Sequence, residues 1–248
     1  SGPCAGPSRG ARPHAAAAPR ALSAPCLARA ARHAGAIVTA EKRAAMMLYD
    51  SRSAPNPRRV RMYLAEKGLS VPTTQVDLGK MQHKSDDFRA LNPVSQTPVL
   101  VLDDGYALSE TIAICRYFEE LHPDPPLFGV GPRGKATVEM WQRRAELGLM
   151  ISVQAVFRHT HPAMTQLENP QVKEIADNHR PRVAAWLEML DRELAGRAFL
   201  AGDAFSVADI TAFVSVEFMR PARLAIPEGL ANVARWRGEV AARPSAAA

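Results

Sequence analysis

Three prolines, Pro123, Pro125 and Pro126, divide this sequence into two parts with different residue patterns. Proline restricts its own backbone and the residue before it, so such a cluster marks a boundary between structural elements. Before the cluster, strand patterns and helix patterns alternate, whereas from about residue 132 to 243 every patterned segment reads as helix. The sequence therefore predicts an α/β domain at residues 46–122, a linker at 123–131 and an all-α domain at 132–248.

The first domain has a defined order of expected elements. Strands are expected at 46–49 and 71–78, helices at 57–67 and 85–91, a hairpin at 99–102 and 106–108, and a closing helix at 109–121. The helix at 57–67 has the clearest signals, since Asn56 is a suitable N-cap, Pro57 fits the first helical position and Gly68 can end the helix.

In the second domain, long helices are expected at 134–158 and at 170–194, the latter capped by Asn169. A further helix should begin at Ser206, because Ser206 and Asp209 have the spacing of a capping box. Phe205 and Ile210 flank that box as a hydrophobic staple. We expect this box to stabilise the fold and to have no catalytic role.

Two short motifs of the first domain suggest a binding site. Pro98, between Thr97 and the expected strand, cannot donate a backbone hydrogen bond, so it belongs at a strand start or in a special turn, where its peptide bond could be cis. Glu110 and Thr111 open a helix, where free N–H groups and the helix dipole can hold a carboxylate. Together the motifs predict a site for a small peptide with an acidic end.

The charge distribution argues against a nucleic-acid partner. Residues 1–45 contain seven basic residues and one acidic residue, so the entire formal charge of +6 lies there and the rest is neutral. This Ala/Pro/Arg-rich segment lacks periodic apolar positions and is expected to be disordered. It could be an Arg-rich targeting peptide, although translated sequence upstream of Met46 or Met47 is the favoured interpretation. No apolar run reaches the roughly 18 residues of a membrane span, so no membrane association is expected.

Cysteine usage is typical of a reducing compartment, and a cytoplasmic location is expected. Cys4 and Cys26 lie in the N-terminal segment, which leaves Cys115 as the single thiol of the predicted domains. One thiol cannot form an internal disulfide. Cys115 falls on the apolar stripe of its helix with Ile112 and Phe118, so we expect it to be buried and unreactive.

The order and spacing of several short runs resemble the cytosolic glutathione transferase family, of the bacterial kind. The resemblance covers nearly all of the chain from Met47 onward. It implies a thioredoxin-like N-terminal domain with a mixed four-stranded sheet, an all-helical C-terminal domain, a homodimer, glutathione as co-substrate and a role in detoxification. The runs that carry it are Leu48-Tyr49-Asp50-Ser51, Pro55-Asn56-Pro57-Arg58-Arg59-Val60-Arg61, Leu64-Ala65-Glu66-Lys67-Gly68, Leu91-Asn92-Pro93, Thr97-Pro98-Val99-Leu100, Ser109-Glu110-Thr111-Ile112-Ala113-Ile114 and Ser206 through Asp209.

The resemblance also implies which residues bind glutathione. Pro98 would be the cis-proline, and the main chain of Thr97 would pair with the cysteinyl part of glutathione as an added strand does. Glu110 would hold the γ-glutamyl ammonium group, and Thr111 with the helix N-terminus would hold its carboxylate. The positions expected near the glycyl carboxylate are His83, Lys84 and Gln96. No metal is expected.

Three residues are candidates for stabilising the glutathione thiolate. Family members use a Tyr, Ser or Cys after the first strand, but the expected position here is Ala54 or Pro55, neither of which has a side-chain donor. The nearby candidates are Ser53, Asn56 and Ser51. Asn56 aligns with an asparagine of a bacterial branch of glutathione-dependent disulfide reductases, although an N-cap role would explain it equally well.

The sequence therefore predicts a glutathione transferase that conjugates glutathione to an electrophilic small molecule. Two alternatives stay open at this point: a glutathione-dependent disulfide reductase on the same fold, and a non-catalytic interaction module. The acceptor pocket is expected to be bordered by residues of the first long helix of the second domain, namely Arg143, Arg144, Met150, Gln154 and Phe157.

Overall fold

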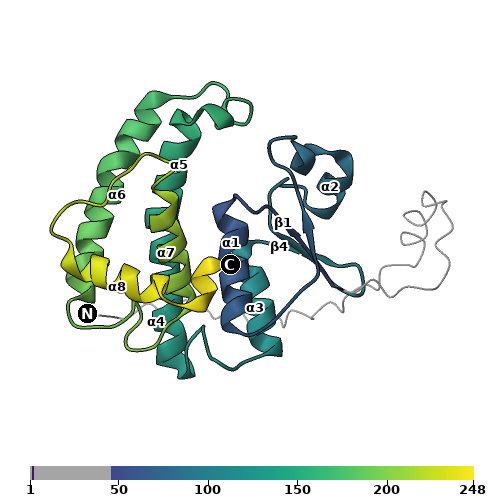
Figure 1. The fold of residues 1–248 in the computed structure, drawn as a ribbon. Helices are drawn as coiled ribbons and strands as arrows, with labels where there is room; N and C mark the ends of the chain where they lie inside the picture. Colours follow the sequence, from purple (N-terminus) through teal and green to yellow (C-terminus); the bar gives the residue numbers. More distant parts are fainter. Residues whose placement is uncertain (1, 3–45) are drawn as a thin grey trace. The chain divides into compact units, whose positions relative to one another are not determined.

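The computed structural model describes Gly2 and residues 46–248 of the 248-residue chain. The predictions made for residues 1–45, disorder and a targeting role among them, lie outside the described residues. The rest contains a small mixed sheet followed by a set of helices (Figure 1). No helix among residues 46–248 is both long and apolar enough to cross a bilayer.

The sheet has four strands: β1 (Met47–Asp50), β2 (Thr73–Gln75), β3 (Val99–Val101) and β4 (Ala107–Ser109). Their order is β2-β1-β3-β4, with β2 parallel to β1, and with β3 antiparallel to both β1 and β4. The predicted mixed four-stranded sheet is therefore confirmed. The strand expected at 71–78 is shorter than predicted, because only residues 73–75 pair with β1 and their side chains are exposed at the sheet edge.

Helices cover both faces of this sheet. The helices α1 (Pro55–Glu66) and α3 (Thr111–Leu121) lie side by side on one face, while α2 (Asp86–Leu91) lies on the other face after the short 3₁₀ turn η1 (Gln82–Lys84) (Figure 1). Apolar side chains of α1, α3 and the second half of the chain form one continuous core. On the α2 face, Phe88 packs with Val76 and Val99 in a smaller core.

The start of α1 differs from the prediction. The helix begins at Pro55 instead of Pro57, and its N-cap is Ala54, so Asn56 is the second helical residue and not the cap. Two prolines are tolerated here because the first-turn N–H groups have no partner within the helix. This difference matters for function, since it removes the N-cap role as an explanation for Asn56.

The first long helix of the second half runs without a break from residue 131 to 160, as α4 (Gly131–Arg144), the π-helix η2 (Ala145–Met150) and α5 (Ile151–Thr160). The prediction of one long helix is confirmed, but the π-helical turn was not foreseen. Gly148 lies within that turn, and a Cβ atom there would be 2.7 Å from the indole nitrogen of Trp186. The glycine thus permits α6 (Lys173–Leu194) to approach closely.

The start of α6 also differs from the prediction, since Val172 and not Asn169 is its N-cap. The preceding segment bonds to the end of α5 instead. Gln171 donates from Nε2 to the carbonyl groups of Arg158 and His161, at 2.6 and 2.9 Å. Because of these bonds, the chain becomes helical only at residue 173.

The predicted helix after Ser206 is α7 (Val207–Phe218), and it lies within the core. The Asp209 carboxylate reaches back to the Ser206 main-chain N–H at 3.0 Å, as the capping box predicts, and Asp209 also accepts from Leu200 N–H and from Trp236 Nε1. Trp236 belongs to α8 (Ala231–Ala241), so this carboxylate connects three segments. The short turns η3 (Pro162–Met164) and η4 (Pro244–Ala247) complete the described elements.

Candidate functional site

The strand register brings all the predicted site segments to one edge of the sheet. Tyr49 near the end of β1 pairs with Val99 at the start of β3, and Val99 pairs with Ser109 at the end of β4. The β1–α1 loop, the Thr97-Pro98 segment and the start of α3 therefore meet at the same edge. The parallel strand β2 also ends there, and η1 follows it in sequence.

Backbone strain is concentrated in these segments. Four described non-glycine residues have a positive φ angle, and three of them, Met81, Ser95 and Glu110, are in or next to segments that the sequence assigns to glutathione. Such conformations cost of order 1–3 kcal/mol each and occur preferentially at ligand clamps. The strain is an indication of function that is independent of residue type.

At the start of α3, Glu110 is the N-cap residue with φ of 70° and an exposed side chain, while Thr111 is buried. The first N–H groups of α3 have no partner within the helix, so they are available to an anion together with the Thr111 hydroxyl. Glu110 carries the opposite charge and can pair with a cation beside that anion. The geometry fits a ligand that carries both an ammonium group and a carboxylate.

The Thr97–Pro98 peptide bond is cis, as the resemblance implied, and Thr97 is 8% exposed. The main-chain N–H and C=O groups of Thr97 form no hydrogen bond with other described residues. They are thus available to an extended peptide. Asn92, which was not predicted as a site residue, shapes this loop by donating to the Gln96 carbonyl at 2.8 Å and accepting from Val94 N–H at 3.1 Å.

The three residues expected near a glycyl carboxylate differ in environment. Gln96 is exposed and Lys84 is partly buried, so both can reach a ligand in solution. His83 is 5% exposed, and its Nδ1 atom has no hydrogen-bond partner among the described residues. Burial, with a smaller effect from Lys84, lowers the pKa of His83, so the imidazole is the neutral form near neutral pH.

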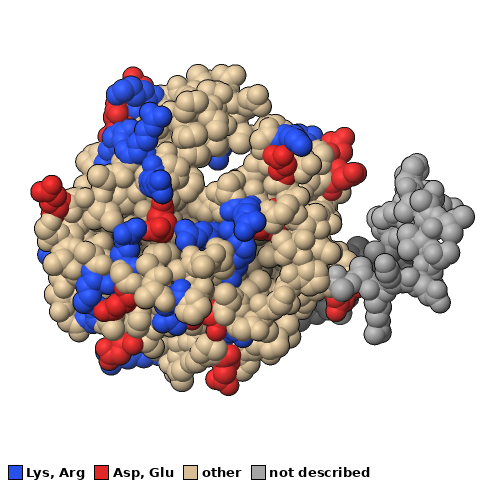
Figure 2. Space-filling view, viewed as in Figure 1, with Lys and Arg blue, Asp and Glu red and all other residues tan. Residues whose placement is uncertain are grey.

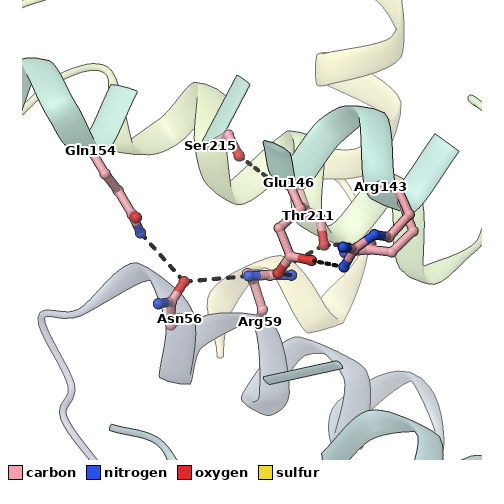
Figure 3. A network of polar contacts seen from close by, with 8 residues as sticks. Asn56, Arg59, Arg143, Glu146, Gln154, Thr211 and Ser215 are labelled. Carbon is pink, nitrogen blue, oxygen red and sulfur yellow. Dashed lines mark hydrogen bonds and ion pairs between the residues drawn. The ribbon is translucent and has the colours of Figure 1, made fainter. Parts of the chain in front are cut away.

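The β1–α1 loop holds the candidates for thiolate stabilisation. Ser51 is buried, and its carbonyl accepts from Ala54 N–H at 3.0 Å, so it helps to form the turn. Ser53 is exposed on the same turn. Asn56, in the first turn of α1, is partly buried and takes part in a network of polar contacts (Figure 3).

The orientation of the Asn56 amide follows from its neighbours. Its Oδ1 accepts from Arg59 Nη1 at 3.3 Å and from Gln154 Nε2 at 3.4 Å. Because a guanidinium group can only donate, the amide oxygen must face Arg59. The Nδ2 donor then lies on the side away from Arg59, as Figure 3 shows, and it forms no hydrogen bond with the described residues.

Sequence reasoning missed the residue that organises this network, Arg59. It is 2% exposed and donates to Thr211 Oγ1 at 3.1 Å and to Glu146 Oε1 at 2.8 Å, in addition to Asn56. Glu146 lies in the π-helix and is also 3.6 Å from Arg143. The sequence did contain a signal for Arg59. It lies three and four residues before the apolar Met62 and Tyr63, so it shares their helix face, and an arginine on a buried face needs a hydrogen-bonding or charged partner.

A polar pocket of about 750 Å³ opens beside the same loop. It is lined by residues 52–55, by the β1 and β2 ends, by the C-terminal half of α7 and by Ala246–Ala248. The residues expected to border an acceptor pocket do not line it: Met150 is buried in the core, and Arg143 pairs with Glu146. Two of them lie near it, because Gln154 contacts Asn56 and Phe157 packs against the pocket residue Phe218 with ring centroids 4.9 Å apart.

Cys115 is fully buried, as predicted. Burial raises the pKa of its thiol to about 12, so Cys115 is not a nucleophile at neutral pH. Residues 46–248 contain no other cysteine, so this part of the chain supplies no reactive thiol to the site.

Comparisons with known proteins agree with this geometry. Residues 54–121 match the family described as glutathione S-transferase, N-terminal domain, and residues 149–244 match the corresponding C-terminal domain. The chain is 36% identical to glutathione S-transferase 2 of Saccharomyces cerevisiae over 203 residues, which is 81% of this chain and 87% of the relative.

Solved structures give the same result. A glutathione S-transferase domain-containing protein of Marinobacter aquaeolei is 40% identical with a TM-score of 0.78, covering 80% of this chain and 98% of that one. A class Gtt2 glutathione S-transferase of Vibrio parahaemolyticus is 30% identical with a TM-score of 0.71, covering 80% and 94%.

Proposed function

Because this chain belongs to the glutathione S-transferase family, we propose that it binds glutathione at the sheet edge, stabilises its thiolate and conjugates it to an electrophilic small molecule. Thr97 would hold the cysteinyl part through its main chain, Glu110 and Thr111 the γ-glutamyl end, and Gln96 and Lys84 the glycyl carboxylate. His83 would contribute as a neutral hydrogen-bonding group.

The observation that carries the activation step is the fixed amide of Asn56. Its oxygen is engaged by Arg59 and Gln154, which leaves the Nδ2 donor for the glutathione sulfur. Lowering a thiol pKa by about two units requires about 2.7 kcal/mol of preferential thiolate stabilisation. A hydrogen bond to a charged group contributes about 1.5–3 kcal/mol, so this donor suffices in magnitude. Ser53 and Ser51 are the second and third candidates for the same role.

The chemistry is nucleophilic attack by the bound thiolate. The thiol proton leaves to solvent, the sulfur forms a bond to the electrophilic carbon, and the leaving group departs with its electron pair. The protein supplies orientation and charge stabilisation, while glutathione supplies the nucleophile.

A second candidate is glutathione-dependent disulfide reduction. It is favoured by the lack of a side-chain donor at Ala54 and Pro55 together with the position of Asn56. In that reaction the thiolate attacks a disulfide sulfur, a mixed disulfide forms and the other sulfur leaves as a thiolate. A second glutathione then releases the product thiol and forms oxidised glutathione.

Three parallel measurements on one preparation test the proposal: glutathione binding by calorimetry, turnover of a chloronitrobenzene and reduction of a small disulfide. Binding with chloronitrobenzene turnover supports the transferase. Binding with disulfide turnover alone supports the reductase, and binding with neither supports a non-catalytic module. Absence of glutathione binding would contradict the proposal as a whole.

The proposal includes a homodimer in the reducing cytoplasm. Exposed apolar side chains support the dimer: Tyr106 is 62% exposed near the hairpin tip, and Leu147 is 53% exposed on the long helix, with Val94, Met140 and Ile151 also exposed. Exposed apolar side chains such as these can be covered when two copies of a chain associate. Light scattering should give a dimer mass, and Leu147→Lys should shift the mass toward the monomer.

A further inference from the structure

Arginines line the pocket beside the β1–α1 loop, and they differ in whether a carboxylate lies close to the guanidinium group. Arg61 Nη1 lies 2.5 Å from Asp50, and Glu217 is bound by Arg237 from α8 at 2.7 Å. The two side-chain carboxylates that line the pocket are therefore already paired. Arg52 and Arg58, which also line it, have no carboxylate within 4.0 Å among the described residues.

Arg58 is the more informative of these two cations. It is partly buried, one of its nitrogens donates to the Ala246 carbonyl at 2.9 Å, and its guanidinium lies 5.7 Å from the ring centre of Phe213. Burial is the main influence on its pKa and lowers it, while the nearby charge of Glu217 raises it by a smaller effect and that of Arg61 lowers it further. A guanidinium in this position can form a bidentate contact with a carboxylate, sulfonate or phosphate.

Part of the pocket lining is apolar. Ala54, Pro55, Val214 and Phe218 contribute to it. In Figure 2, Lys and Arg side chains gather near the middle of the face that is viewed. A pocket with an apolar wall and unpaired guanidinium groups suits a flat organic molecule that carries an anionic group.

The pocket is also next to the proposed thiolate position. Residues 53–55 line it and directly precede Asn56, and Phe218 packs on Phe157, three residues beyond Gln154. None of the residues assigned to glutathione at η1, Thr97 or Glu110 lines it. It is thus adjacent to the glutathione-binding segments and shares with the proposed thiolate position the loop residue Ser53.

We propose that this pocket holds the acceptor substrate, and that the preferred acceptors are aromatic electrophiles carrying an anionic group bound by Arg58. This inference rests on the proposed transferase function and specifies its substrate class. With a chloroarene, the glutathione sulfur forms a bond to the ring carbon, the carbon–chlorine bond breaks, chloride leaves and the thiol proton passes to solvent.

A pair of substrates that differ by one carboxylate tests the inference: a chlorodinitrobenzene and the corresponding chlorodinitrobenzoate. The readout is the ratio of kcat/KM for the benzoate to kcat/KM for the benzene.

Arg58→Met should lower this ratio about tenfold, since one charge-assisted contact is lost, and Arg58→Lys should restore part of it. Glu217→Gln removes a neighbouring negative charge and should raise the ratio, a change that a merely structural role would not produce. Arg180→Met, an equal charge change at a partly exposed site on α6, should leave the ratio and the turnover unchanged.

A binding measurement separates failure of this inference from failure of the proposed function. Dinitrobenzoate, which lacks the leaving group, should bind the wild-type protein in calorimetry and should bind Arg58→Met about tenfold more weakly. Normal turnover of the neutral substrate with an unchanged ratio in Arg58→Met would overturn the inference and leave the transferase standing. Equal losses for both substrates would assign Arg58 to structure, which also overturns it. Arg58-dependent binding without turnover of either substrate would overturn conjugation, and the acceptor role with it.

Discussion

Gln154 of α5 and Asn56 of α1 lie on helices from the two halves of the chain, and their side-chain amides meet at 3.4 Å. Arg59 holds the same Asn56 oxygen from the opposite side, at 3.3 Å. The orientation of one amide group therefore depends on contacts with both halves of the chain. This arrangement leads to the first two predictions.

Asn56→Ala should raise the pKa of glutathione bound to the protein by about one unit or more, because the loss of one hydrogen bond to the thiolate removes about 1.5 kcal/mol or more of its stabilisation. Asn56→Asp should raise it further, since a carboxylate repels the thiolate. The thiolate absorbance of the complex as a function of pH gives both values. If Ser53→Ala or Ser51→Ala raises the pKa while Asn56→Ala does not, the donor is that serine.

Gln154→Ala should have a smaller effect than Asn56→Ala, because Arg59 still holds the amide oxygen. We expect a few-fold decrease in kcat with little change in the KM for glutathione. Gln154→Glu should be more harmful, since a carboxylate beside Oδ1 favours turning the Asn56 amide away from the sulfur. Equal kinetics for the two variants would argue against control of the amide by residue 154.

Glu110→Gly should separate stability from binding. The residue has φ of 70°, which glycine adopts without strain, so the melting temperature should stay the same or rise. Loss of the carboxylate should weaken glutathione binding by about tenfold or more in calorimetry. Glu110→Gln keeps the strained backbone and should weaken binding without raising the melting temperature. Undiminished binding in both variants would remove Glu110 from the site.

Asp209→Ala should destabilise the fold by at least about 3 kcal/mol, because it leaves buried donors of Ser206, Leu200 and Trp236 without an acceptor. Asp209→Asn keeps the shape and should be less harmful. Denaturant unfolding measures both. Asp203→Ala, at an exposed position in the preceding loop, is the control and should change stability by less than about 0.5 kcal/mol.

Glu66 should make the attachment of the C-terminal segment sensitive to acid. Burial alone would raise its pKa, but hydrogen bonds from Arg243 and Ser245 outweigh burial and lower the pKa below the ordinary 4.5. The resulting stability is present above pH 4.5 and is lost as the pH falls through the lowered value. The stability difference between wild type and Glu66→Gln should therefore be largest near neutral pH and disappear in acid. A difference that is constant with pH would contradict this.

The features predictable from sequence were those with local signals. Hydrophobic periodicity and turn residues gave the order of strands and helices, and the capping box located α7 through Ser206 and Asp209. The Thr97-Pro98 and Glu110-Thr111 motifs led to segments that the strand register brings to one edge. Residues that depend on tertiary partners were less accessible: Arg59 was missed, and for Asn56, a candidate for thiolate stabilisation, the alternative N-cap role is taken by Ala54. The pocket that contains Arg58 is lined by residues of α1, α7 and the C-terminal segment. No local sequence pattern indicates that these three parts of the chain meet.

The direction in which Gln154 points depends on the number of residues in the π-helix between α4 and α5. Each residue turns an α-helix by about 100°, so the wider turn at Ala145–Met150 sets the direction in which every later side chain of α5 points. The wide turn takes up one more residue than an α-helical turn does, so if the same residues formed a regular α-helix, Gln154 would be rotated by about 100° relative to α4 and would no longer face Asn56. Deleting the exposed Leu147 should therefore shorten the wide turn and keep Gln154 facing Asn56, whereas inserting a further residue there should turn Gln154 away and separate the two halves of the chain at their amide contact.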